Sequence, residues 1–340
     1  MTRRLAPHPD DQKSRPRSGR MVLALGIALL IVFVAWTAGW FYMASRLESQ
    51  MRQAIAQFSE GSGEASCAQM DVWGYPFQLG VSCEPVTFLT DDRQYAGKAK
   101  AFHSSVQLND PNRIAGEVEA PLQLESSRFP PLSVGWDHMS LSTRYAEPLP
   151  ETLSIDGRNV TFVLQENGSL LAEVGRLLVK TKVDQSDLDI TLRLADMTSP
   201  MTGGEGLPPL SLEADVSLTD GVPILAQNGL ASMRGLSGRL DQVHLRAGSG
   251  DAQLWISGDY EVDSDGLIDG DIKIKLQSPE EIGDLLAELV PAEADAIRGA
   301  FDALDNFAVN DGRTPSIPVK VENGVPSILF IKLPAIPPLP

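Results

Sequence analysis

The two cysteines are the residues whose chemistry is most tightly constrained by their spacing. Cys67 and Cys83 are the only cysteines of the 340-residue chain, and fifteen residues lie between them. A Cys-x-x-Cys redox motif is absent, and a zinc site would need two further ligands that His103, His138 and His244 do not supply at ligand spacing. Because an apolar segment typical of export precedes them, we expect a structural disulfide, worth about 3 kcal/mol in the chain-entropy model.

Other catalytic or cofactor-binding motifs are not found in the sequence. The Gly-x-Ser-x-Gly, phosphate-loop, His-Glu-x-x-His and dinucleotide motifs are absent, and the glycine-rich residues 203–206 lack a following helix. Two of the many carboxylates could pair for glycoside hydrolysis, but their alternation with apolar residues is typical of solvent-facing strand positions. We therefore predict no enzymatic activity, no cofactor and no metal, and histidines that are structural or exposed.

The loop between the cysteines holds the densest run of aromatic and turn residues in the chain. Trp73, Tyr75 and Phe77 alternate with smaller or polar residues, and Pro76 forces Tyr75 toward an extended backbone. Residues 74–77 therefore predict a turn, and we expect a disulfide-pinned hairpin that seals one end of a core. An aromatic binding patch is the alternative.

An uncharged apolar run precedes this loop. Residues 1–20 are polar and basic and are expected to be disordered, whereas residues 21–42 carry no charge. As a helix the run spans about 33 Å, which matches a hydrocarbon core of about 30 Å. Six basic residues precede it, so the positive-inside rule places the N-terminus in the cytoplasm and residues 43–340 outside. A cleaved signal peptide is the alternative. The outer end of the apolar run resembles an interfacial aromatic belt, which consists of Trp36, Trp40, Phe41 and Tyr42.

The region after the anchor begins with a short amphipathic helix and is strongly acidic. An apolar stripe predicts a stalk helix over residues 43–60 that packs on the domain. A dimerising helix is the alternative. The stripe consists of Leu47, Met51, Ile55 and Phe58.

The chain carries a net charge of −17, of which residues 1–42 contribute +4 and the remainder −21. The remainder is therefore unsuited to nucleic acid, and any lipid contact there must be apolar.

Residues 64–340 predict a single β-rich domain. Strict apolar–polar alternation marks strands over residues 188–194, 210–218, 252–262 and 268–276. Turn pairs such as Asn167-Gly168, Asp220-Gly221 and Asp265-Gly266 predict tight hairpins. We expect a large curved antiparallel meander with one apolar face, which must be covered by barrel closure, by a second sheet, or by helices or ligand on a curled sheet.

The C-terminal region predicts two helices, a hairpin and an extended arm. Ser278, Pro279 and the acids after them suit a helix start, so helices are expected near residues 279–290 and 292–307, capping the open sheet. A hairpin is expected next, around Asn323-Gly324. The proline-rich residues 334–340 are expected to lie along the domain edge, an exposed recruitment peptide being the alternative.

Residues 72–77, together with the Gly-Val-Ser-Cys of residues 80–83, resemble the envelope proteins of alphaproteobacteria grouped as domain-of-unknown-function family 2125. The resemblance extends to residues 109–112, 120–122, 135–136 and the proline-rich end. It implies a bacterial inner-membrane protein facing the periplasm, but no activity, since the family has no established one. Its motif residues here are Trp73, Gly74, Tyr75, Pro76, Phe77 and Gly80.

A second resemblance covers one hairpin. Residues 251–276 resemble AsmA-like envelope proteins, which curl long sheets around an apolar groove implicated in lipid traffic. These features favour a non-enzymatic protein, tethered to the inner membrane, that binds or passes lipid. A scaffold acting through protein–protein contact is the alternative, and a periplasmic hydrolase is a third. The sequence leaves open whether the apolar face is an open groove or a filled core.

Overall fold

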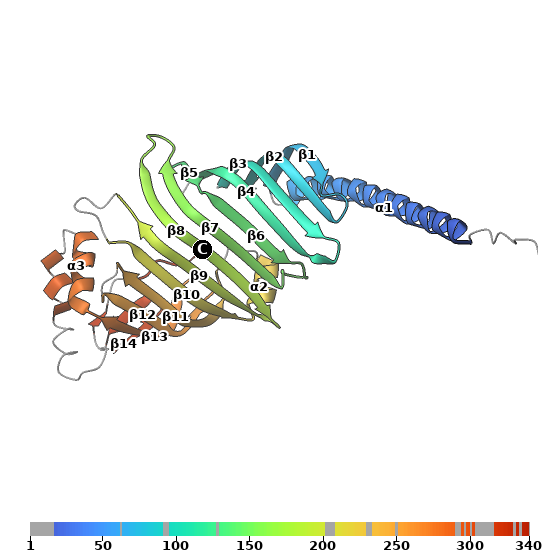
Figure 1. The fold of residues 1–340 in the computed structure, drawn as a ribbon. Coiled ribbons are helices and arrows are strands. Elements are labelled where there is room, and N and C mark those ends of the chain that lie inside the picture. The colour runs from blue at the N-terminus through green and yellow to red at the C-terminus, as the bar shows by residue number, and fades with distance from the viewer. Residues whose placement is uncertain are drawn as a thin grey trace, which may run out of the picture.

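The protein consists of one very large antiparallel sheet with a long helix projecting from one end (Figure 1). The computed structural model describes residues 17–61, 63–90, 95–126, 129–200, 208–228, 233–248, 251–289, 294–295, 297–299, 301–302, 316–328, 331–332 and 335–339. Most of the basic tail predicted over residues 1–20 lies outside these ranges.

Helix α1 (Arg17–Gly61) is continuous over 45 residues, so the predicted anchor and stalk form a single element. Its apolar part is long enough to cross a membrane. All residues from 21 to 36 are exposed. Leu47, Met51 and Ile55 of the predicted stripe are half-buried, whereas the side chain of Phe58 lies outside the described residues.

The described strands form one curved antiparallel sheet in which neighbours in sequence are almost always neighbours in space (Figure 1). The exception is β6, which pairs with β4 and β7 beside β5. The strands are β1 (Gly63–Trp73), β2 (Gln78–Thr90), β3 (Tyr95–Gln107), β4 (Asp110–Ser126), β5 (Leu132–Gly135), β6 (His138–Arg144), β7 (Thr152–Leu164), β8 (Leu170–Asp184), β9 (Asp187–Thr198), β10 (Leu210–Thr219), β11 (Ser237–Ala247), β12 (Gln253–Val262), β13 (Ile268–Gln277), β14 (Ser316–Glu322), β15 (Val325–Ile328) and β16 (Ile331–Lys332).

The four alternating segments recognised in the sequence are strands β9, β10, β12 and β13. Two of the predicted tight turns are confirmed, because Gly168 and Gly266 adopt the positive φ that such turns require. The pair Asp220-Gly221 is different. Asp220 does have positive φ, but Gly221 begins helix α2 (Gly221–Asn228) instead of the next strand.

Helix α2 packs on the apolar face of the sheet, which we define as the side carrying the alternate apolar residues of these four strands. Val222 and Leu225 of α2 form a buried cluster with Leu188, Leu218 and Leu236. Leu188 and Leu218 are, respectively, near the start of β9 and near the end of β10. The helix therefore covers the apolar face where these strands end.

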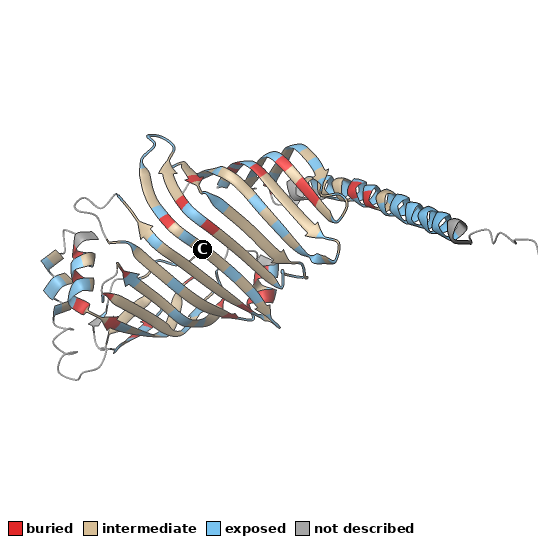
Figure 2. Ribbon diagram, in the orientation of Figure 1, coloured by how far each residue is buried: buried red, intermediate tan, exposed pale blue. Residues whose placement is uncertain are grey.

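A second buried cluster lies on the apolar face further toward the N-terminus. It is centred on Val134, Val160 and Val174 of strands β5, β7 and β8. Around it the apolar side chains pack against one another along the sheet, without a second layer of strands among the described residues. Figure 2 shows that most of the sheet is neither fully buried nor fully exposed, as expected for a single layer.

The C-terminal helices lie at the end of the sheet remote from α1 (Figure 1). Helix α3 (Pro279–Leu289) begins at Pro279, as predicted, and Ser278 precedes it. Of the second predicted helix, residues 294–295, 297–299 and 301–302 are helical, and the remainder lies outside the described residues. Arg298 pairs with Asp284 at 2.8 Å, which joins this segment to α3.

The proline-rich C-terminal residues run along two hairpin turns. The amide of Ile336 donates to the carbonyl of Gly324 at 2.7 Å, and that of Leu339 donates to the carbonyl of Gly266 at 2.8 Å. The expected extended arm is therefore present over residues 335–339. The hairpin expected around Asn323-Gly324 is formed by β14 and β15, and the return strand begins at Val325, directly after the two-residue turn.

Candidate functional site

The predicted disulfide is present and joins the first two strands. Cys67 of β1 and Cys83 of β2 are bonded, with their Cα atoms 5.4 Å apart. Met70 is the residue opposite Cys83 in the ladder, so the bond crosses the strand pair diagonally. It fixes the β1–β2 hairpin near its middle. The aromatic turn at the tip of the hairpin remains free to contact another element.

That tip contacts the apolar part of α1. Strand β1 has 11 residues and extends about 36 Å at ~3.3 Å per residue. Helix α1 rises about the same distance, ~36 Å, between Thr37 and Gly61. Because β1 runs back along the helix that precedes it, residues 74–77 arrive beside residues 36–41. Residues 36–41 belong to the predicted membrane-spanning run, whereas the domain was expected to pack on the stalk, residues 43–60.

Trp40 is the centre of this contact. Its indole nitrogen Nε1 donates to the carbonyl of Gln78 at 2.8 Å, and its ring meets that of Tyr75 edge-on with centroids 5.4 Å apart. Phe41 stacks on Tyr75 with centroids 6.2 Å apart and meets Trp40 edge-on at 5.2 Å. Trp40 is only 7% exposed and therefore does not belong to the lipid-facing belt predicted from sequence. Trp36, Phe41 and Tyr42 are exposed, as that belt requires.

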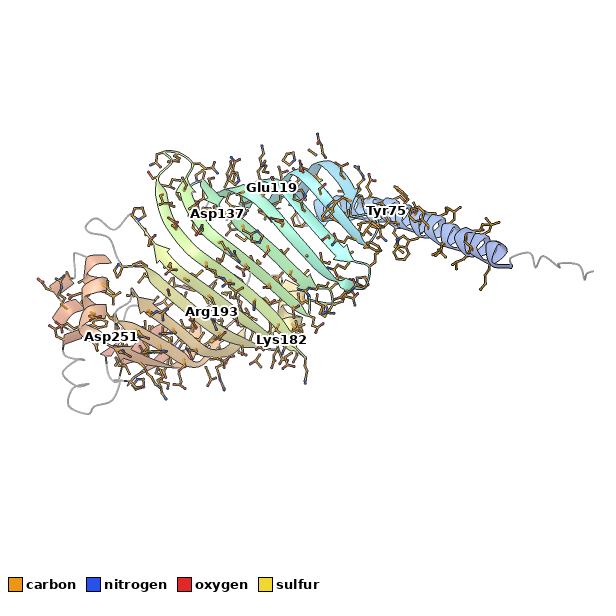
Figure 3. All side chains as sticks on the ribbon, in the orientation of Figure 1. Tyr75, Glu119, Asp137, Lys182, Arg193 and Asp251 are labelled. Atoms are coloured by element: carbon orange, nitrogen blue, oxygen red, sulfur yellow. A yellow bond between two sulfur atoms is a disulfide. The ribbon has the colours of Figure 1, made fainter. Side chains whose placement is uncertain are left out.

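Two further hydrogen bonds join the turn to the helix deeper in the apolar run. The indole nitrogen of Trp36 donates to the carbonyl of Pro76 at 3.0 Å. The hydroxyl groups of Thr37 and Tyr75 lie 2.8 Å apart. Figure 3 shows Tyr75 beside α1. Polar groups of the helix that would otherwise lie among apolar residues are thus paired with the turn.

The glycines of the motif permit this geometry. Gly74 has φ +106°, and a Cβ there would lie 2.8 Å from the carbonyl oxygen of Gln78. That close approach belongs to the bond from the Gln78 amide to the Gly74 carbonyl, which closes the turn. Gly80 lies opposite Trp73, and a Cβ there would meet the indole ring at 2.5 Å. Both positions therefore require glycine for steric reasons.

Leu108 is a site residue that sequence reasoning missed. It lies in the turn between β3 and β4, and its amide donates to the carbonyl of Phe77 at 3.3 Å. Together with α1 it borders an apolar cleft of about 380 Å³; the lining residues are Val32, Ala35, Trp36, Gly39, Trp40, Met43 and Leu108. A lone leucine in a turn is the signal that could have suggested it.

The opposite, polar face of the sheet carries cross-strand ion pairs. Lys100 lies 2.8 Å from Glu119, and His103 lies 3.3 Å from the same carboxylate. Hydrogen bonds from Lys100 and His103 hold the pKa of Glu119 below its usual range. Arg193 likewise lies 2.7 Å from Asp215 and lowers the pKa of that carboxyl. Figure 3 labels Glu119 and Arg193 on strands far apart in the sheet, so these pairs do not form one centre.

The three histidines that the structure describes do not converge on one another. His103 contacts Glu119, and His138 lies 3.5 Å from Glu117. His244 stacks on Trp255 with centroids 4.8 Å apart and bonds to Gln253. Among the residues that the structure describes, none form a group of histidine, cysteine or acidic side chains suited to a metal ion.

Comparison with known proteins gives a family but no relative of known activity. The family model described as "Uncharacterized protein conserved in bacteria (DUF2125)" matches residues 40–337. No significant match was found among curated proteins or among solved structures. The resemblance of residues 251–276 to AsmA-like proteins therefore stays a prediction.

Proposed function

The chain belongs to the DUF2125 family of bacterial proteins, and from this premise we propose that it is a non-enzymatic, membrane-anchored protein that holds lipid acyl chains on the apolar face of its sheet. We place the sheet in the periplasm, because α1 fits an inner-membrane anchor and the bond between Cys67 and Cys83 requires an oxidising compartment.

One observation carries the proposal. In the middle of strands β9, β10, β12 and β13 apolar side chains outside the α2 cluster are only half-buried; they include Leu192, Leu212, Leu254, Ile256, Ile272 and Ile274. In a filled core such residues would be buried, and a contiguous apolar surface of this kind is rarely left open to water. Acyl chains would complete the missing second layer.

The distribution of buried residues suggests how the chains would lie. Leu188, Leu218 and Val262 are buried at one set of strand ends, and Ala247, Ala252 and Leu276 are buried at the other set. The half-buried band lies between these ends and crosses the strands. A ligand in the band would therefore run across the sheet, along the direction that leads through β7 and β4 toward β1 and α1.

Charge argues that the contact is with acyl chains and not with anionic head groups. The polar face carries the carboxylates that alternate with the apolar residues, and the chain outside residues 1–42 has a net charge of −21. Such a surface repels anionic head groups at long range. Apolar contact alone remains as the source of affinity, at about 25 cal/mol per Å² of buried apolar surface.

The test is photo-crosslinking in living cells at two adjacent positions. A benzophenone amino acid replaces Leu212, on the apolar face of β10, or Glu213, on the polar face of the same strand. Strand β10 is eight strand spacings from β1 along the sheet, about 38 Å at ~4.8 Å each, so bilayer lipid around the anchor is out of reach. We expect a radiolabelled-phosphate adduct at position 212 and none at position 213.

Two outcomes would contradict the proposal. Equal lipid labelling at both positions would show unspecific contact, and adducts to protein alone at position 212 would favour the scaffold hypothesis. The full chain is used, and both variants must form the Cys67–Cys83 disulfide to be compared. Glu213 is about half exposed and lies 3.4 Å from Arg193, which keeps its shorter contact with Asp215, so replacing Glu213 is expected to cost little stability.

A further inference from the structure

We infer that the two turns nearest α1 insert into the outer leaflet of the membrane that α1 crosses. The insertion tip, as we call it, consists of Tyr75, Pro76 and Phe77 of the β1–β2 turn and Leu108 of the β3–β4 turn. Its partner is the acyl-chain region of the bilayer. This inference concerns how the sheet is seated on the membrane and does not depend on lipid binding by the apolar face.

The depth of the tip is set by its contacts with α1. The uncharged run ends at Tyr42, and Trp36 lies six residues before that end, about 9 Å deeper along the helix axis. The carbonyl of Pro76 accepts the hydrogen bond of Trp36. A run of about 33 Å just fills a hydrocarbon core of about 30 Å, so residues at this position along α1 lie within the membrane. Pro76 therefore lies there as well.

The backbone of the tip is suited to a medium without water. The carbonyls of Gly74, Pro76, Phe77 and Gln78 each accept a hydrogen bond within the protein. The donors are the Gln78 amide, the Trp36 indole, the Leu108 amide and the Trp40 indole, respectively. Unpaired backbone groups cost several kcal/mol in a bilayer core, whereas an ordinary surface turn can leave its carbonyls to water.

Two side chains of the tip, Tyr75 and Phe77, are exposed, whereas Pro76 and Leu108 are half-buried. Phe77 is 71% exposed although it is a phenylalanine, and Tyr75 is 41% exposed. Phe33 and Phe41 of α1 are about as exposed, at 60% and 62%. The exposed aromatic side chains of the tip therefore continue the exposed apolar surface of α1 onto the edge of the sheet.

The cleft between Leu108 and α1 fits the same partner. Its lining residues run from Val32 to Met43 of the helix, a rise of about 16 Å, and they are apolar apart from the indole nitrogens. Both indole nitrogens, on Trp36 and Trp40, already donate to the turn. The cleft therefore presents no free polar group from these side chains, and an acyl chain of the outer leaflet is the ligand of matching chemistry.

The depth can be measured by spin labelling of the full chain in vesicles of phosphatidylethanolamine and phosphatidylglycerol. The native cysteines are bonded to each other, so Phe77→Cys or Leu108→Cys gives a single free thiol for a nitroxide. Asn167→Cys, in the exposed β7–β8 turn, is the matched control. We expect collisions with oxygen, relative to a water-soluble nickel chelate, to be several-fold more frequent at positions 77 and 108 than at position 167.

Two results would overturn the inference. Nickel accessibility at positions 77 and 108 equal to that at 167 would place the tip in water. Protection of position 77, which is exposed in the single chain, from both oxygen and nickel would show that protein covers the tip, and in purified vesicles this would be a second copy of the chain. Position 108 tests the inference independently if Phe77→Cys disturbs the turn. Neither outcome bears on the crosslinking at Leu212, so the two proposals can fail separately.

Discussion

Single residues decide where the first hairpin can turn and pack. The motif around residues 73–80 is recognisable in the sequence, but its role becomes clear only from contacts forty residues away along the chain. Tyr75 and Pro76 are held by Thr37 and Trp36 of the helix. A sequence pattern reports local backbone preferences such as those of glycine and proline, and it carries no information about which distant residue completes a hydrogen bond.

Gly74 offers a prediction at the residue scale. Gly74→Ala places a Cβ 2.8 Å from the Gln78 carbonyl at a φ of +106°, so we expect a loss of about 1–3 kcal/mol from strain and clash together. The measurement is thermal unfolding of the full chain in detergent. Gly168→Ala is the control, because Gly168 has φ +70° but no atom within 4 Å of a Cβ, and it should cost less. Equal losses in both variants would show that the contact with Gln78 is irrelevant.

At the scale of elements, the long strands were predictable and the short helix α2 was not. Strands β9, β10, β12 and β13 have strict alternation that no helix would show. Helix α2 is eight residues long and begins within an Asp-Gly pair, which favours a hairpin turn. Its stability comes from Val222 and Leu225, which are buried against β9 and β10. Such tertiary packing outweighs local preference, so the pair correctly predicted a turn at Asp220 and wrongly predicted a strand directly after it.

The candidate site was predictable only in part, because it too depends on contacts between distant parts of the chain. The disulfide was expected from composition and compartment, since two cysteines in an exported domain have one way to pair. The position of the turn on α1 was not, because it depends on the match between the length of β1 and the rise of the helix. Leu108 comes to the site through the β2–β3 and β3–β4 pairings, whose registers are set by the whole ladder.

The disulfide gives a prediction for the β1–β2 hairpin as an element. Replacing both Cys67 and Cys83 with serine removes a cross-link that, in the chain-entropy model, stabilises by about 3 kcal/mol. We expect a lower unfolding temperature and faster proteolysis within β1 and β2, with the C-terminal strands less affected. Limited proteolysis with mass mapping measures both. The control is Ser66→Ala together with Ser82→Ala, which alters neighbouring side chains and keeps the bond. Uniform proteolysis along the chain would contradict a local role.

At the scale of the whole molecule, the sheet has too many strands to remain flat, and as a single layer it does not enclose a core. Strongly twisted open sheets rarely exceed about ten strands without curling, and the described part of this sheet has sixteen. A single layer with an apolar face cannot be covered by α2 alone, since the buried cluster that α2 forms is centred on one set of strand ends. This shortage of covering elements among the described residues is the physical reason for which we propose a ligand on the apolar face.

The arrangement of the molecule across the membrane gives the last prediction. The sequence places Ser14 in the basic tail and Asn167 in the sheet, on opposite sides of the apolar run. In intact spheroplasts we expect a membrane-impermeant maleimide to label Asn167→Cys, and to label Ser14→Cys only after the membrane is permeabilised. Labelling in the reverse order would show that the topology is inverted. The disulfide would then lie in a reducing compartment, where disulfides are unfavourable. If the apolar run were cleaved as a signal peptide, the mature chain would lose the Ser14→Cys label altogether and shrink by the mass of the basic tail and the run together. Retention of both labels on one full-length chain therefore decides for an anchor, on which the seating of the tip depends.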